Sequence, residues 1–106
     1  MIARVWYGWT RPENGDAYET LLKGEIFPGI LRRNVAGFRR IELYRAPVGD
    51  EVEFATVMWF DSLDAVKAFA GAEYEVAVVP PKARAVLKRF DARSKHYEVR
   101  EGRDAN

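Results

Sequence analysis

Two short stretches near the ends of the chain carry the side chains best suited to chemistry. Arg4 and Trp6 lie in RVWYGW, and His96 and Glu98 lie in SKHYEVR. His96 is the only histidine, and an imidazole titrates near neutral pH, so it is suited to abstract a phenolic or α-carbonyl proton. Arg4 would hold the resulting anion, Glu98 would orient His96, and Trp6 would stack on a flat substrate. These residues form the predicted site.

Each of these four residues also has a purely structural alternative. His96 could hydrogen-bond within a contact between subunits, and Trp6 could fill such a contact. Arg4 and Glu98 could form a cross-strand ion pair, which would contribute only about 0.2–1 kcal/mol. The sequence leaves both interpretations open.

Two further aromatic residues are candidates for substrate binding. Trp59 ends an apolar stretch, and Tyr74 follows a short predicted helix, where it could cover a cavity or donate a proton. The alternatives are a core position for Trp59 and a loop anchor for Tyr74. The chain has no cysteine, and its acidic segments GDEVE and EYEVAVV lack the spacing of a metal-binding loop. We therefore expect no metal and no cofactor.

Composition narrows the class of protein. The chain has 106 residues, of which 48% are hydrophobic and 31% charged, as expected for one soluble domain. Its net charge is +1, and the basic stretch 82–95 is best explained as a solvated helix face, so we expect no nucleic-acid partner. No apolar run is long enough to span a bilayer. We expect a cytoplasmic protein that does not bind membranes.

Hydrophobic periodicity predicts the elements that must position these residues. Strands are expected at 2–9, 38–45, 52–60 and 94–100. A first helix is expected to begin near Thr10 or Asp16 and to end or kink at Pro28. Two more helices are expected at 63–70, capped by Asp61 or Ser62, and at 82–90. Residues 73–79 fit either a strand or a loop.

This order of elements is that of a ferredoxin-like βαββαβ fold of the α+β class. Its antiparallel sheet would carry the first strand in the centre and the helices on one face. Residues 1–100 would form the single domain, and residues 101–106 a polar tail. The other sheet face would be a large exposed apolar patch, which a second subunit would cover, so we expect a homodimer.

The alternation along the first strand predicts which side chains face the helices. A charge beneath packed helices is costly unless it is paired. Arg4, Trp6 and Gly8 are therefore expected on the face away from the helices, in a cavity between two sheets, and Tyr7 and Trp9 beneath the helices. The strand at 52–60 is apolar on both faces, so its orientation stays open.

The segments IARVWYGWT, VEFATVMWFDSLDAVKAFAG and SKHYEVR resemble the antibiotic biosynthesis monooxygenase family, whose members are dimeric α+β barrels. The resemblance extends over residues 1 to about 100. The family includes cofactor-free oxygenases of polycyclic phenols, quinol oxygenases, haem-degrading enzymes, an isomerase of a small signalling molecule and many members of unknown role. The resemblance therefore implies a fold and a cavity, not a particular reaction. Haem-degrading members use an asparagine, a tryptophan and a histidine at places held here by Trp6, Phe69 and Val79. The resemblance therefore does not extend to haem chemistry.

These arguments lead to two functional hypotheses. The first is a cofactor-independent monooxygenase, or a related isomerase, that acts on a small phenolic, quinol or carbonyl compound in a cavity at the dimer sheet. The second is a non-catalytic protein of the same fold that binds a small ligand or acts as a scaffold.

Overall fold

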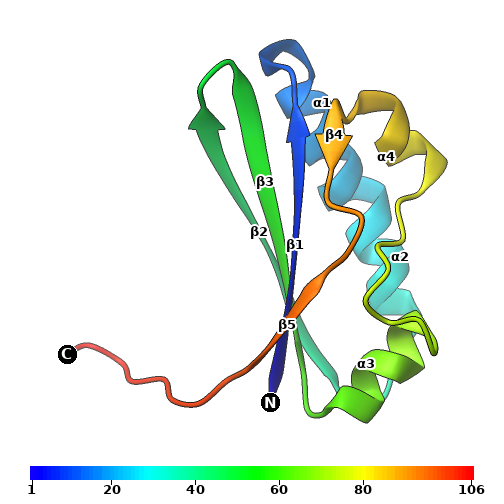
Figure 1. The fold of residues 1–106 in the computed structure, drawn as a ribbon, viewed down its shortest axis with the longest axis vertical. Coiled ribbons are helices and arrows are strands. Elements are labelled where there is room, and N and C mark those ends of the chain that lie inside the picture. The colour runs from blue at the N-terminus through cyan, green and yellow to red at the C-terminus, as the bar shows by residue number, and fades with distance from the viewer.

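The computed structural model describes residues 1–106 and contains one antiparallel sheet with every helix on one of its faces (Figure 1). The strands are β1 (Ile2–Thr10), β2 (Phe38–Val48), β3 (Glu51–Phe60), β4 (Arg89–Phe90) and β5 (Lys95–Glu98). The α-helices are α1 (Gly15–Leu21), α2 (Phe27–Arg32), α3 (Leu63–Ala70) and α4 (Pro81–Val86). None of the helices is both long and apolar enough to cross a membrane.

The sheet order confirms the predicted ferredoxin-like fold. The strands run β2-β3-β1-β4, and β5 also pairs with β1, so β1 is central. All pairings are antiparallel. β4 and β5 together take the place of one long strand along β1. Residues 99–106 lead away from the sheet without regular structure (Figure 1).

The register shows that the predicted face assignment of β1 is wrong. Arg4 lies opposite Met58 and Trp6 opposite Thr56, so these four side chains share one face. Met58 belongs to a core cluster with residues of α3, and Trp6 packs against a second cluster that contains residues of α1 and α4. Arg4, Trp6 and Gly8 therefore lie beneath the helices.

The same alternation leaves the other side chains of β1 on the uncovered face of the sheet. Val5 lies opposite Val57 and Tyr7 opposite Ala55. Tyr7 is 37% exposed, which agrees with its position on a face that no helix covers. The prediction failed because it treated a charge under the helices as unsatisfied, whereas Arg4 finds neutral hydrogen-bond partners there.

The first helical region continues past Pro28, where the sequence predicts an end or a kink. A π-helical turn, Leu22–Ile26, joins α1 to α2, and Pro28 stands in the first turn of α2. A proline inside a continuous helix lacks the N–H that would bond to the preceding turn, and its ring crowds that turn. The wider π turn thus allows the helical chain to run on to Arg32, and the added length forms one wall of the site described below.

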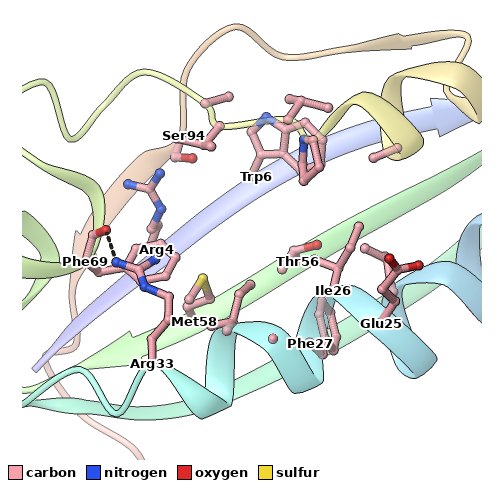
Figure 2. A pocket seen from close by; sticks show the side chains of 18 of the residues that line it. Arg4, Trp6, Glu25, Ile26, Phe27, Arg33, Thr56, Met58, Phe69 and Ser94 are labelled. Atoms are coloured by element: carbon pink, nitrogen blue, oxygen red, sulfur yellow. Dashed lines mark hydrogen bonds between the residues drawn. The ribbon is translucent and has the colours of Figure 1, made fainter.

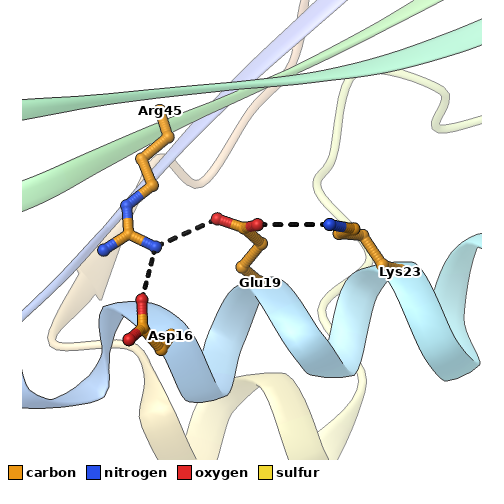
Figure 3. Close-up of polar contacts among 4 residues, drawn as sticks. All are labelled: Asp16, Glu19, Lys23 and Arg45. Atoms are coloured by element: carbon orange, nitrogen blue, oxygen red, sulfur yellow. Dashed lines mark hydrogen bonds and ion pairs between the residues drawn. The ribbon is translucent and has the colours of Figure 1, made fainter.

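Ion pairs hold the start of this helical region to the sheet (Figure 3). Arg45 of β2 donates hydrogen bonds to Asp16 at 2.9 Å and to Glu19 at 3.0 Å, and Glu19 also pairs with Lys23. The hydrogen bonds from Arg45 and Lys23 lower the pKa of the Glu19 carboxyl. These contacts fix the orientation of α1 and with it the side chain of Tyr18.

The C-terminal third differs from the prediction in its boundaries. α4 ends at Val86 because Leu87 adopts an extended backbone, and Arg89–Phe90 forms β4 instead of the last turn of a helix. Residues 73–79 form a turn and a loop rather than a strand, with a single bridge between Val76 and Arg93. The loop continues across the helix-covered face and reaches Pro80 at the start of α4.

The predicted cap of α3 is confirmed at Ser62. Its hydroxyl accepts a hydrogen bond from the backbone N–H of Ala65 at 3.2 Å. Asp61, the other predicted cap, instead pairs with Arg39 on β2. The cap fixes the start of α3 and so the place of Phe69 at its far end.

Candidate functional site

A cavity of about 390 Å³ lies between the sheet and the helices of a single chain (Figure 2). Its size is at the lower end of the range for small-molecule sites. Most of its wall is apolar, with contributions from β1, β3, the α1–α2 region, α3 and the loop that leads to α4. Its lining residues include Arg4, Trp6, Tyr18, Phe27, Arg33, Thr56, Met58, Phe69, Val79 and Ser94.

Arg4 places a buried positive charge in this wall. The residue is only 5% exposed. Its Nη1 donates to the backbone carbonyl of Tyr74 and lies 2.9 Å from Nε2 of His96. No carboxylate lies within ion-pair distance, and burial lowers the pKa of the guanidinium. A buried cation without an acidic partner is unfavourable unless an anion joins it.

A second guanidinium lies at the same end of the cavity (Figure 2). Arg33 donates to the backbone carbonyl of Phe69 at 2.8 Å, and its Cζ is 4.6 Å from the centre of the Phe69 ring. Cζ of Arg4 is 5.8 Å from the same ring. Glu25 is the only acidic residue of the wall, and it pairs with Lys82 at 2.8 Å. The end of the cavity at Phe69 is therefore cationic.

Trp6 forms a flat wall next to Arg4. Its Nε1 donates to the backbone carbonyl of Asp91 at 2.7 Å, and its ring centre is 6.0 Å from that of Phe90. Gly8 leaves room for this ring, because a Cβ there would lie 3.2 Å from Trp6 and 3.1 Å from Leu87. The hydrogen bond to Asp91 and the contact with Phe90 thus hold the indole in one orientation.

Tyr18 of α1 contributes a phenol to the wall that sequence reasoning missed. Its ring packs edge-on against Phe54, with ring centres 4.8 Å apart, and the residue is 1% exposed. Burial raises the pKa of the Tyr18 hydroxyl, which is therefore neutral. Its spacing with Leu21 and Leu22 reads as an ordinary apolar helix face, and no feature of the sequence separates a core tyrosine from one that lines a cavity.

With this geometry established, comparison with known proteins places the chain in a family. The family model described as antibiotic biosynthesis monooxygenase matches residues 1–79. The chain belongs to the antibiotic biosynthesis monooxygenase family. A comparison with curated proteins finds no significant match.

Solved structures similar to the chain share its fold at low sequence identity. One is a candidate antibiotic biosynthesis monooxygenase from Bacillus cereus, with a TM-score of 0.70, 16% identity and coverage of 99% of this chain and 96% of that one. Another is a Streptomyces coelicolor monooxygenase in complex with the ligand nanaomycin D, with a TM-score of 0.64, 16% identity and coverage of 99% and 91%. A Mycobacterium tuberculosis protein has a TM-score of 0.56, 21% identity and coverage of 97% and 98%.

Three residues of the cavity wall are Trp6, Phe69 and Val79. They are the residues that the sequence resemblance matched to the asparagine, tryptophan and histidine of haem-degrading members. No group of three or more histidine, aspartate or glutamate side chains is arranged to hold a metal ion. The side chains that a ligand in this cavity would contact are mainly aromatic and aliphatic, together with the guanidinium groups of Arg4 and Arg33.

His96 lies behind Arg4 and not in the cavity wall. Its ring contacts the edge of Tyr74, with centres 5.2 Å apart, and burial together with the charge of Arg4 lowers its pKa. It opens instead onto a separate polar pocket of about 450 Å³, which it shares with Tyr74, Glu75, Arg93, Ser94 and Lys95. The predicted nearness of Arg4 and His96 holds, but the imidazole does not face a ligand in the cavity.

Three of the predicted site residues lie elsewhere. Glu98 is exposed and pairs with Arg100 at 3.2 Å, so it does not orient His96. Trp59 pairs with Ala3 on the uncovered sheet face, away from the cavity. The Tyr74 side chain faces His96, and only its backbone carbonyl reaches Arg4. Glu98 and Trp59 were placed by strand position and Tyr74 by its place after a helix, and the reversed orientation of β1 moved the cavity to the other side of the sheet.

Proposed function

We propose that the chain is a cofactor-independent monooxygenase that acts on a flat phenolic, quinol or carbonyl compound bound in this cavity. The observation that carries the proposal is Arg4, a buried cation without an acidic partner in a mainly apolar wall that contains aromatic rings. Such a site favours a planar ligand that can become an anion. The Streptomyces coelicolor neighbour was solved with nanaomycin D, so we add this compound to the panel for testing.

Arg4 would act by stabilising the ionised substrate. A cation within about 4–6 Å typically lowers the pKa of an acid by about 1–3 units, and more so where water is excluded. The proton passes to water, and the resulting phenolate or enolate is electron-rich and can pass electrons directly to dioxygen. When a ring CH₂ group becomes a carbonyl, one oxygen atom stays on carbon and the other leaves as water. The substrate then supplies all four electrons, so no external reductant is needed.

His96 would position Arg4 rather than take the substrate proton itself. Its neutral Nε2 accepts a hydrogen bond from the guanidinium Nη1, 2.9 Å away, and holds it toward the cavity. The lowered pKa keeps the imidazole neutral, and a neutral imidazole avoids repulsion with Arg4. His96→Gln should therefore reduce turnover less than a change of Arg4 does.

The test is oxygen uptake with a panel of anthrones, hydroquinones and nanaomycin D. Arg4→Gln should lower kcat/KM by about 10²–10³-fold, the range seen when one oxyanion-stabilising donor is removed. Arg40→Gln is the matched control, because Arg40 is an exposed arginine of β2 on the other sheet face. Activity that survives Arg4→Gln would contradict the proposal.

The alternative function is ligand binding without turnover. It is favoured by the wall itself, in which no histidine lies and the only carboxylate is paired with Lys82. In that case panel compounds would raise the melting temperature of the protein without oxygen uptake or a change in the ligand's absorbance.

We also propose that two chains associate through their uncovered sheet faces. Large side chains, among them Tyr7 and Trp59, lie on this face of the central strands. A soluble protein rarely leaves such a surface open to water. Because the cavity is formed within one chain, this dimer would support the sheet behind the site and would not enclose the ligand.

A further inference from the structure

The Tyr18 hydroxyl is a buried hydrogen-bond donor without a partner in the chain. Tyr18 is 1% exposed and lines the cavity, yet its hydroxyl makes none of the side-chain hydrogen bonds of the structure. Thr10 Oγ1 is the only fully enclosed side-chain polar atom without a partner. The Tyr18 hydroxyl is therefore not fully enclosed, and the open space that the Tyr18 residue lines is the cavity. A group in this position can form a hydrogen bond to a ligand in the cavity in place of water.

Tyr18 and Arg4 serve different ends of the cavity. Tyr18 packs on Phe54, which pairs with Gly8, whereas Arg4 pairs with Met58. Gly8 and Arg4 are four residues apart on β1, so these ends are separated by about 13 Å along the strand at about 3.3 Å per residue. Trp6, whose ring forms the flat wall, lies midway between them. A ligand stacked on Trp6 can thus reach toward both groups.

The two ends of the cavity favour different oxygen atoms of a ligand. Arg4 is a cation that favours an oxyanion. Tyr18 is a neutral phenol, because burial raises its pKa, and it offers one O–H to an uncharged acceptor. No cationic side chain of the wall is paired with Tyr18. A negative charge at this end would therefore lack a stabilising cation, whereas a neutral carbonyl needs none.

We propose that Tyr18 is a substrate-positioning residue that donates a hydrogen bond to a carbonyl oxygen of the ligand, at the end remote from Arg4. The substrate class is then a fused-ring hydroxy ketone or hydroxyquinone with its ionisable hydroxyl and its carbonyl at opposite ends. This assignment rests on the proposed function for the choice of an oxygenated aromatic ligand. It adds the second polar group and the direction in which the ligand lies.

The test compares two probes that differ only in the carbonyl. They are 6-hydroxy-1-tetralone and 5,6,7,8-tetrahydro-2-naphthol, and their binding is measured by calorimetry without oxygen, so that no turnover is required. Tyr18→Phe should weaken binding of the ketone by about three- to tenfold, as expected for one hydrogen bond, and leave the plain phenol unchanged. Arg4→Gln should weaken both probes.

Tyr44→Phe is the matched control, because it removes an exposed hydroxyl from β2 that bonds Glu42. It should change neither affinity. If Tyr18→Phe folds poorly, infrared spectra of the ketone bound to the wild-type chain provide the second readout, and its carbonyl band should lie at lower frequency than that of the same ionisation state of the ketone in an apolar solvent.

Equal weakening of both probes by Tyr18→Phe, no effect on either, or an unshifted carbonyl band would overturn the assignment, as would failure of both probes to bind. A selective loss of the ketone in a protein that consumes no oxygen would support the role of Tyr18 while contradicting the proposed oxygenase.

Discussion

Arg4 is hydrogen-bonded to two neutral acceptors, the Tyr74 carbonyl and the His96 imidazole. Protonation of His96 would remove one of them and place a second positive charge beside Arg4. Burial and the nearby guanidinium both lower the pKa of His96 below its ordinary value of 6.5. In the unfolded chain that pKa returns to the ordinary value, and the unfolded state then binds the proton more readily than the native state. Stability is therefore full above about pH 6.5 and falls as the pH drops through the lower native pKa.

We expect this loss of stability to disappear in His96→Gln, which keeps a hydrogen-bond acceptor but cannot be protonated. The measurement is the free energy of unfolding in urea at pH 7.5 and at pH 5.5, for wild type and variant. Wild type should lose more stability between these pH values than the variant does. His96 is the only histidine, so no second imidazole confuses the comparison. Identical losses in both proteins would contradict the role given to the Arg4–His96 contact.

The sequence predicted part of this site because neighbouring strands fix which residues meet. Arg4 and His96 lie opposite each other on β1 and β5, as the strand order requires. Arg33 and Tyr18 were missed for a physical reason. Tyr18 has the spacing of a core residue, and Arg33 lies beyond a proline that favours the end of a helix. Their roles depend on a cavity between elements, which no local pattern encodes.

At the scale of elements, the connection from α2 to β2 carries a glycine that the fold requires. Gly37 has φ of +83°, and a Cβ there would lie 2.7 Å from Cβ of Ala65 at the start of α3. Its carbonyl also accepts a hydrogen bond from the N–H of Asp61 at 2.8 Å. The close approach of this backbone to α3 sets the distance between the helix layer and the edge of the sheet.

Gly37→Ala should therefore destabilise the protein by about 2 kcal/mol or more, through the left-handed backbone and the contact with Ala65 together. Gly49→Ala is the matched control. Gly49 has φ of +59°, and nothing lies within 4 Å of the place that a Cβ would occupy, so only the backbone penalty of about 1–2 kcal/mol applies. Urea unfolding of both variants gives the comparison. A smaller effect at Gly37 than at Gly49 would show that Ala65 moves aside freely.

The sequence was informative about the order of elements and less so about their ends and faces. Short apolar stretches located β1 and β3, and a cap located the start of α3, since these signals act within a few residues. The π turn before Pro28 and the early end of α4 depend on packing against the sheet. The face of β1 was misjudged because a buried charge was treated as lacking partners, and the Tyr74 carbonyl comes from a distant loop.

At the scale of the whole molecule, the reversed face changes what a dimer would do. A cavity between two sheets would exist only in the dimer, whereas the observed cavity is complete in one chain. The uncovered face is then free to serve association alone. This face carries exposed aromatic residues, among them Tyr7 at 37% and Tyr97 at 46% exposure, and this is the observation that still favours a dimer.

Tyr7→Glu should convert a dimer into a monomer, because it would bury a carboxylate between two apolar sheet faces. Light scattering should give about twice the monomer mass for wild type and the monomer mass for the variant. Leu31→Glu is the control, since Leu31 is 54% exposed on α2, on the opposite side of the sheet, and should leave the mass unchanged. A wild-type monomer would contradict the proposed association. It would leave the cavity unchanged, since the cavity lies on the helix-covered face of the sheet.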